Sequence, residues 1–473
     1  DIEQADKVII ILAEGTTNTL SDGEKYTYAS ADVDEPNAAL FSKANLTISG
    51  SGTLRVSGNY ADAITSKDGL LIRDAHIEVS AADDGIRGKD YLVIENATLS
   101  VNAGGDALKS DNDDPEALGA VLIDASSLEI NADGDGISAE GAVQINSGTY
   151  TIQTAGGSRA SLSADASAKG IKGLNAVVIN DGSFTLDSAD DALHSNGSIV
   201  VNGGTFTINT GDDALHADTA LTINGGELNI LSSYEGLESA LITVSGGEIA
   251  LVASDDGINA ASAAAGTGGQ MLRGGPGGMG GQAGNFWFYQ TGGFIYVNAG
   301  GDGVDTNGSA SISGGTLLVD GPTDNGNGAL DYMGTFSISG GVVAAAGSAG
   351  MAMSASQDSS QPSVLIAFES AQQAGTLVTL QDASGLNVLA YAPSKPFQTL
   401  LLSSPELKTG GAYNVLLGGS STGTQQDGLY LGGSTSGADT YAALTLTGTI
   451  TTLGTAGGFG GPGAPGGPGG RRP

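Results

Sequence analysis

The chain has 473 residues, with 52 acidic and 17 basic side chains, so its formal net charge is −35; glycine supplies 78 residues, and cysteine is absent. This charge disfavours nucleic acid and anionic lipid as partners, because their phosphates require Lys and Arg. The lack of cysteine excludes disulfides, thiolate catalysis and cysteine-based zinc sites. No apolar run reaches the ~18 residues that a membrane-spanning helix needs, so we expect no membrane insertion.

A short motif recurs along most of the chain: an acidic residue, then Gly or Ala, then an aliphatic residue. Most copies are 22 residues apart, as in Asp191, Asp213 and Glu235 (213 − 191 = 235 − 213 = 22). Glycine pairs such as Gly203-Gly204 recur in step with it, between short alternating apolar segments that predict strands. This period is too short for a propeller blade and lacks a leucine-rich consensus. It predicts an all-β parallel β-helix, in which equivalent residues of successive coils stack in columns.

The repeat also predicts the domain organisation. Residues 1–353 are expected to form the β-helix, with about 12–13 coils of ~22 residues and a Gly-rich insertion at 261–284. After Met353 the repeat stops, and residues 354–455 show hairpin-like strands that predict a C-terminal β-domain capping the last coil. The Gly/Pro-rich segment 456–473 is predicted to be a tail without a core.

The acidic residues of the motif predict a metal site. Stacked coils lie ~4.8 Å apart, and two carboxylates at that distance repel each other by ~1 kcal/mol in water and by more near a protein surface. Such a density of hard oxygen ligands suits Ca²⁺, which takes six to eight oxygens. The alternative is that these acids cap the coil corners by accepting backbone N–H groups. The predicted calcium ligands are Asp190, Asp191, Asp212, Asp213, Glu235, Glu238, Asp255, Asp256, Asp302 and Asp305.

Basic and aromatic residues predict where a sugar would bind. An outward column beside the acids holds Arg87, Lys109, Lys172, His194 and His216. With Ca²⁺, these cations suit the carboxylates of an acidic sugar; alternatively, they are counter-charges for the acidic column. A second set consists of rings predicted to face outward, where they can stack on sugar rings or pack beneath the neighbouring insertion: Trp287, Tyr289 and Tyr296.

Four segments resemble one known family. They are residues 34–43 (DEPNAALFSK), 190–197 (DDALHSNG), 233–238 (SYEGLE) and 325–332 (NGNGALDY). They look like the carbohydrate-binding β-helix family typified by a surface protein of a cellulolytic clostridium, and the resemblance runs from about residue 7 to residue 453. It implies a right-handed parallel β-helix similar in shape to pectate lyases, bound calcium, and binding of polygalacturonate or cellulose without established cleavage.

These observations lead to one main hypothesis and two alternatives. The main hypothesis is an extracellular or cell-surface, calcium-binding, non-catalytic protein that recognises plant-type polysaccharide, either acidic and pectin-like or cellulose. We see no signal peptide, although one would be removed on secretion. The first alternative is a surface adhesin or filament subunit that self-assembles through its coil ends. The second is a pectate-lyase-like enzyme, whose base would be Arg87, Lys109 or Lys172.

Overall fold

The computed structural model describes residues 2, 4–30, 32–114, 118–163, 165–261 and 283–455, and these contain strands but no helix. The part of the chain described therefore offers no helix long and apolar enough to cross a membrane. The chain forms two compact units, Asp1–Ala250 and Leu251–Pro473. Most of the predicted insertion and the predicted tail lie outside the described residues.

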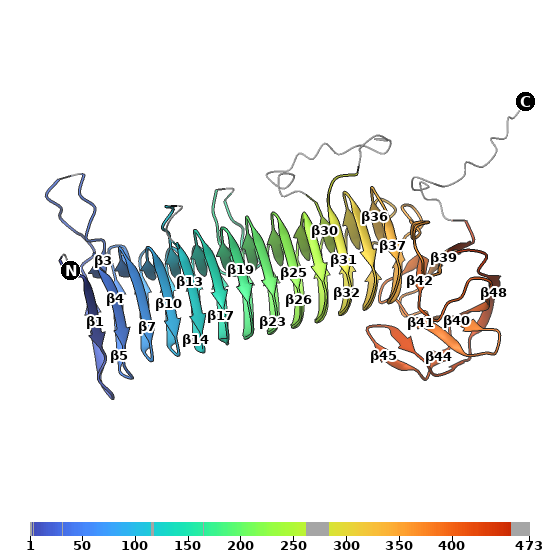
Figure 1. Cartoon of the computed structure of the whole chain (residues 1–473), viewed down its shortest axis with the longest axis horizontal. Coiled ribbons are helices and arrows are strands. Elements are labelled where there is room, and N and C mark those ends of the chain that lie inside the picture. Colours follow the sequence, from blue (N-terminus) through green and yellow to red (C-terminus); the bar gives the residue numbers. More distant parts are fainter. Residues whose placement is uncertain are drawn as a thin grey trace, which may run out of the picture. The chain divides into compact units, whose positions relative to one another are not determined.

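Unit 1 consists of successive coils, each of which contributes one strand to each of three parallel sheets, named A, B and C here (Figure 1). Sheet A contains the short strands that follow the acidic motif: β3 (Ala38–Ser42), β6 (Asp62–Ser66), β9 (Ile86–Gly88), β12 (Leu108–Ser110), β15 (Ile137–Ala139), β18 (Ile171–Gly173), β21 (Leu193–Ser195), β24 (Leu215–Ala217) and β27 (Leu237–Ser239). Sheet B contains β1 (Lys7–Ile11), β4 (Asn45–Ser49), β7 (Gly69–Arg73), β10 (Tyr91–Glu95), β13 (Ala120–Asp124), β16 (Ala142–Ile145), β19 (Ala176–Ile179), β22 (Ser198–Val201), β25 (Ala220–Ile223) and β28 (Leu241–Val244).

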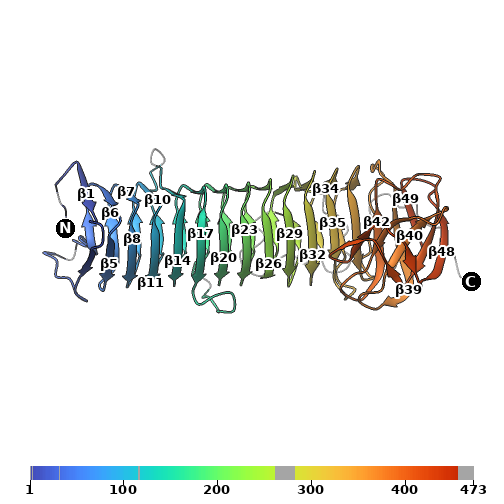
Figure 2. The same cartoon turned by 90° about the horizontal axis from the view of Figure 1, so that it is seen from below.

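Sheet C carries the longest strands of unit 1, which lie side by side in Figure 2. They are β2 (Thr17–Ser21), β5 (Thr53–Gly58), β8 (His76–Ala81), β11 (Thr98–Ala103), β14 (Ser126–Ala132), β17 (Gly148–Thr154), β20 (Ser183–Ser188), β23 (Thr205–Thr210) and β26 (Glu227–Ser233); β29 (Glu248–Ala253) begins in unit 1 and ends in unit 2. Strand register repeats the sequence period, since Leu193 pairs with Leu215 and Leu215 pairs with Leu237.

Unit 2 begins with the same coil pattern. Its parallel strands are β30 (Ile258–Ala260), β33 (Val304–Thr306) and β36 (Leu330–Tyr332) in sheet A, β31 (Trp287–Gln290), β34 (Ser309–Ile312) and β37 (Phe336–Ile338) in sheet B, and β32 (Phe294–Ala299), β35 (Thr316–Asp320) and β38 (Val342–Gly347) in sheet C. Counted over both units, sheets A and B hold 12 and 13 strands among the described residues. The prediction of an all-β parallel β-helix is confirmed.

Antiparallel pairing starts where β42 (Phe397–Ser403) lies against β38. On its other side β42 pairs with β39 (Ser363–Gln372), which in turn pairs with β49 (Ile450–Leu453). A further sheet and a small two-stranded sheet complete the unit. The further sheet contains, in order, β45 (Thr424–Gln426), β46 (Leu429–Leu431), β41 (Asn387–Tyr391), β40 (Val378–Asp382), β43 (Ala412–Leu417) and β48 (Asp439–Thr445), and the small sheet pairs β44 (Ser420–Ser421) with β47 (Thr435–Ser436).

A buried carboxylate ties these later strands to the coils of unit 2. Asp320 of β35 is 1% exposed. Its oxygens accept hydrogen bonds from the hydroxyls of Tyr391 (2.7 Å) and Tyr296 (2.9 Å) and from the backbone N–H of Ser394 (2.7 Å). Because a buried carboxylate is stable only when its oxygens are satisfied, this network holds the segment after β41 against the sheet C strands β32 and β35.

The interior of unit 1 is filled by columns of like side chains. In sheet C, Tyr150, Phe184 and Phe206 follow one another on β17, β20 and β23, and each is at most 2% exposed. Their rings stack almost in parallel, with centroid separations of 4.7 and 4.5 Å and interplanar angles of 7°. Coil spacing therefore sets the stacking distance of the rings.

Glycine is required at the corner before the sheet C strands. The second glycine of the repeated pair has a positive φ, for example 100° at Gly204 and 99° at Gly226. A Cβ added at Gly204 would also lie 2.9 Å from the carbonyl oxygen of Gly182 in the preceding coil. Both the dihedral and the close approach of two backbones exclude other residues, as the Gly-Gly step predicts.

We expect Phe184→Ala to lower the free energy of unfolding by about 3–5 kcal/mol, because it leaves a cavity between two stacked rings. Thr185→Ala, at the exposed neighbouring position, is the matched control and should change stability by less than about 0.5 kcal/mol. Urea unfolding followed by circular dichroism measures both values. Equal midpoints for the two variants would contradict the assigned inward register.

Candidate metal and carbohydrate site

The acidic motif lies at the corner where each coil enters sheet A. There, one carboxylate oxygen of the acid accepts a hydrogen bond from a backbone N–H of the next coil. The Oδ1 atom of Asp84 accepts the backbone N–H of Asp106 (3.0 Å), and that of Asp191 accepts the N–H of Asp213 (3.0 Å). In unit 2, Asp256 accepts the N–H of Asp302 (2.6 Å) in the same way. The corner-capping interpretation therefore accounts for one oxygen of these carboxylates.

In unit 1 the second oxygen faces a cation. The Lys109 ammonium lies 3.0 Å from the Oδ2 atoms of both Asp84 and Asp106. Arg87 lies 3.9 Å from Asp62 of the motif and 2.5 Å from Asp111, which is outside the motif, and Lys172 pairs with Asp135 at 3.1 Å. These cations thus neutralise the acidic column, which is the counter-charge interpretation, and only 19–28% of each cationic side chain is exposed.

The ion pairs keep the basic side chains charged. Burial lowers the pKa of Lys109, but the carboxylates of Asp106 and Asp84 outweigh this effect and hold the pKa above its ordinary value. The pKa of Arg87 is likewise raised, because the pull of Asp111 exceeds the effect of burial. A general base must be unprotonated before it can accept a proton from the substrate. The raised pKa values keep Lys109 and Arg87 protonated, so this environment is unfavourable for base catalysis by either residue.

One of the predicted calcium groups in unit 1 contains an ammonium. Ligand atoms of Asp190, Asp191 and Asp212 lie within 4.8 Å of one another. The Nζ atom of Lys169 sits 2.8 Å from Asp190 Oδ1 and 2.7 Å from Asp191 Oδ2. Burial, followed by the charge of Asp191, raises the pKa of Asp212 to about 6. At this corner the carboxylates already have a monovalent counter-charge.

The coils of Asp191 and Asp213 carry histidine at the sheet A position that holds Lys109 and Lys172 in earlier coils, and we call this position the cation position. His194 Nδ1 lies 2.8 Å from Asp191 Oδ2, and His216 Nδ1 lies 2.9 Å from Asp213 Oδ2. His216 Nδ1 also lies 2.8 Å from Glu238 Oε2 of the following coil. Burial lowers the pKa of His216, but Asp213 and Glu238 overcome this and raise it to about 11.

In unit 2 the cation position changes its character. The three consecutive sheet A strands carry Asn259, Asp305 and Asp331 there, in place of Lys, Arg or His. Ligand atoms of Asp256, Asp302 and Asp305 lie within 4.8 Å of one another. We call these last three residues the unit 2 carboxylate cluster.

Burial and repulsion within this cluster raise the pKa values of its carboxyl groups. Burial, together with the charge of Asp256, raises the pKa of Asp302 to about 7. The pKa of Asp305 is raised well above its usual range, first by burial and then by Asp256 and Asp302. Among the described residues, no basic side chain pairs with Asp302 or Asp305. Burial and mutual repulsion thus both disfavour the charged forms of Asp302 and Asp305.

The remaining predicted ligands flank these groups. Asp255 is adjacent to the unit 2 carboxylate cluster and contributes to the raised pKa values of Asp302 and Asp305. Glu235 continues the acidic column of unit 1, and its backbone N–H donates to Asp213 Oδ1 (3.1 Å). The structure thus brings the predicted acids into several separate groups along sheet A.

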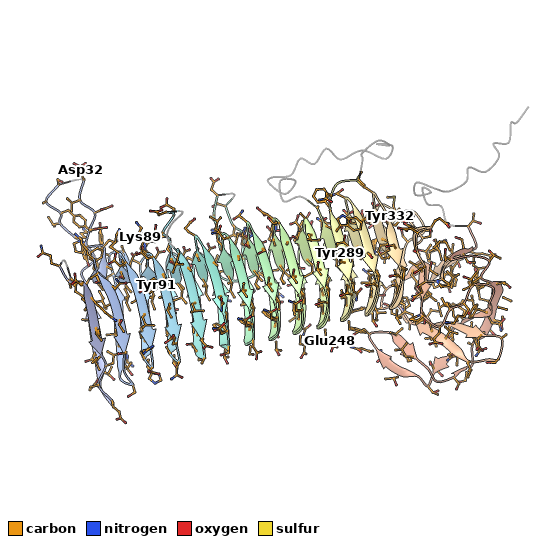
Figure 3. The ribbon with its side chains drawn as sticks, in the orientation of Figure 1. Asp32, Lys89, Tyr91, Glu248, Tyr289 and Tyr332 are labelled. Atoms are coloured by element: carbon orange, nitrogen blue, oxygen red, sulfur yellow. The ribbon has the colours of Figure 1, made fainter. Side chains whose placement is uncertain are left out.

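The predicted aromatic residues fall into two environments. Trp287 and Tyr289 lie half-buried on β31 and stack on each other, with ring centroids 5.1 Å apart and an interplanar angle of 5°; Figure 3 labels Tyr289. Tyr296, in contrast, bonds Asp320 and packs against the apolar cluster of the antiparallel strands. The Trp287–Tyr289 pair is therefore better placed than Tyr296 to receive a sugar ring.

Sequence reasoning did not identify a hollow on the outer face of sheet C in unit 1. Its volume is about 490 Å³, and polar side chains of β5, β8 and β11 line it, among them Arg55, His76, Glu78, Ser100 and Asn102. Arg55 donates from Nε and Nη2 to the two carboxylate oxygens of Glu78, at 2.9 and 3.2 Å. The available signal was the run of polar residues at outward positions of these strands.

Comparison with known proteins places this architecture in a family. The family model described as carbohydrate-binding domain-containing protein matches residues 1–214 and 199–273. Because these matches cover more than half of the chain, the chain belongs to the family of carbohydrate-binding domain-containing proteins. The family resemblance seen in the sequence is confirmed at this level; calcium binding and a pectate-lyase-like shape stay predictions.

One curated relative shares part of the chain. A carbohydrate-binding domain-containing protein of Acetivibrio thermocellus is 38% identical over 80 residues, which are 17% of this chain and 28% of that protein. The match thus spans less than a third of the relative's length. No solved structure matches the chain.

Lys169→Met should lower the free energy of unfolding by about 3 kcal/mol in the presence of a chelator, because it removes the ammonium that pairs with both Asp190 and Asp191. Lys408→Met, at an exposed lysine, is the control and should behave like the unmodified chain. Chemical denaturation measures the difference. If both variants were equally stable, Lys169 would not be the neutralising group.

Proposed function

We propose that this protein is a non-catalytic, calcium-dependent polysaccharide-binding protein. Its family membership supports carbohydrate as the ligand. The observation that carries the metal dependence is the unit 2 carboxylate cluster, where the cation position of the coils is occupied by further acid. Its closely spaced carboxylates favour a divalent cation over separate monovalent counter-ions.

The donor set of the cluster fits Ca²⁺. Asp256, Asp302 and Asp305 offer only oxygen ligands, which hard cations prefer, and calcium takes six to eight of them. Three side chains leave part of such a shell open for water or for oxygens of a ligand. A bound ion would therefore let this acidic protein attract a carboxylate-bearing sugar, which would otherwise be repelled. This chemistry favours an acidic, pectin-like chain over cellulose.

Two further features support binding without cleavage. The basic residues proposed as alternative lyase bases form ion pairs, and carboxylates raise the pKa values of Arg87 and Lys109. The stacked pair of Trp287 and Tyr289 offers an apolar ring surface with polar edges, which suits sugar stacking. We also propose an extracellular or cell-surface location, where a protein would meet plant-type polysaccharide. Self-assembly through the coil ends stays a prediction.

The test is retention on insoluble polysaccharide. We expect the protein to bind a calcium-free polygalacturonate resin when Ca²⁺ is added and to elute with EDTA, with weaker retention on cellulose. The double variant Asp302→Asn/Asp305→Asn removes two charges of the cluster and should abolish the calcium-dependent part. Asp133→Asn, at an exposed acid outside the groups described above, is the control and should be retained.

Two outcomes of this experiment would overturn the proposal. Retention that is unaffected by both EDTA and the double variant would show that the carboxylate cluster is not involved. Release of unsaturated products, detected by ultraviolet absorbance of the supernatant, would show a lyase instead of a binding protein.

The raised pKa of Asp302 also predicts the pH dependence of stability. Its pKa is about 7 in the fold and 3.8 in the unfolded reference. Between these values the Asp302 carboxyl binds more protons in the folded chain than in the unfolded chain, so its contribution to the free energy of unfolding falls as the pH rises from about 4 to about 7. In a chelator, we expect the melting temperature to fall over this range, and less so for Asp302→Asn. Added Ca²⁺ should stabilise the protein most above pH 7, where Asp302 is ionised.

A further inference from the structure

Two histidines occupy adjacent positions on the outer side of sheet A. His194 of β21 and His216 of β24 are direct register partners, and Glu238 of β27 follows His216 in the next coil. The ring centroids of the histidines are 5.0 Å apart. In the preceding coil the same position holds Lys172, whose ammonium pairs with an acid but cannot coordinate a metal while it is protonated. An imidazole can do both, because a bound divalent ion displaces its proton.

Three ligand atoms converge at the second histidine. His216 Nδ1 lies 2.9 Å from Asp213 Oδ2 and 2.8 Å from Glu238 Oε2. A ring nitrogen carries one hydrogen in one direction, so it cannot make two good hydrogen bonds to carboxylates of different coils. Asp213 is 5% exposed and Glu238 is 7% exposed, so water has little access to the convergence point.

The distances fit a metal after small shifts. Ligands of a tetrahedral zinc ion sit 2.0–2.2 Å from it, which places neighbouring ligand atoms about 3.3 Å apart. The His216, Asp213 and Glu238 atoms would need to separate by a few tenths of an ångström, which small rotations of the two carboxylate groups would supply. A second group, formed by Asp191, His194 and His216, has its ligand atoms within 4.8 Å of one another. It places His194 next to His216.

The donor set also selects the kind of ion. Calcium prefers oxygen ligands only, whereas one imidazole nitrogen with two carboxylate oxygens suits zinc and its neighbours among the divalent transition metals. The unit 2 carboxylate cluster contains no histidine and therefore has the opposite preference. The chain thus carries two donor sets of different chemistry.

We propose that Asp213, His216 and Glu238 form a binding site for a divalent transition-metal ion, with Zn²⁺ as the reference ion. Asp213 and His216 come from one coil and Glu238 comes from the next, so a bound ion links successive coils by side chains. The site is separate from the proposed calcium cluster, and neither depends on the other.

The test is zinc titration of the full chain after removal of metals, in a buffer with excess Ca²⁺ that occupies oxygen-only sites. We expect isothermal titration calorimetry to show one zinc site in the unmodified chain. His216→Asn and Glu238→Gln should each weaken it at least about 100-fold, since losing even an outer-shell partner costs 10–100-fold. His76→Asn, which changes an exposed histidine of β8, is the control and should bind zinc unchanged.

A direct measurement separates loss of the site from loss of the fold. Circular dichroism establishes that each variant is folded, and zinc X-ray absorption of the loaded protein should show nitrogen and oxygen ligands with an imidazole contribution. The proposal is overturned if the unmodified chain binds no zinc in the presence of excess Ca²⁺. It is also overturned if folded His216→Asn and Glu238→Gln both bind zinc as tightly as the unmodified chain.

Discussion

The structure depends on one constraint: each coil lies in register with the next, so a side chain faces its own equivalent 22 residues later. The acidic corner shows the consequence most clearly, because Asp191 Oδ1 accepts the backbone N–H of Asp213, the residue that replaces it in the following coil. This contact holds the corners together, but it also stacks like charges at coil spacing. The chain must therefore neutralise a column of acids that its own backbone geometry creates.

The way in which the acids are neutralised changes along sheet A. Lysine and arginine face the acids in the earlier coils of unit 1, as Lys109 does between Asp84 and Asp106. Histidine replaces them at His194 and His216, and the acidic Glu238 follows in the last sheet A strand of unit 1. In unit 2 the same position holds Asn259, Asp305 and Asp331. The neutralising group thus passes from a fixed ammonium to an imidazole within unit 1, and the proposed calcium ion would take this role in unit 2. Proposed metal selectivity follows from this order and not from any single residue.

The sequence predicted which residues form the columns of the site better than it predicted which side chains pair with them. The outward basic column and the acidic column were both visible, because a fixed period makes equivalent residues easy to align. The counter-charge alternative could not be decided, however, since it depends on which carboxylate oxygen a flexible lysine reaches. Lys169 was also not identified as a partner, because it occupies an acid position of the motif and bonds acids of the following coil. Tyr296 faces the antiparallel strands, and no local pattern predicted that they would bury it.

The sequence alone determined the period, the inward apolar columns, the glycine corners and the all-β class, because each is a local preference repeated many times. Tertiary structure decided what depends on contacts between distant segments: the pairing of Asp320 with Tyr391, the hollow beside Arg55 and Glu78, and the convergence of Asp213 and Glu238 on one nitrogen of His216. The physical reason is that a repeat specifies where a backbone position recurs, whereas rotamers and neighbouring coils specify which atoms meet there.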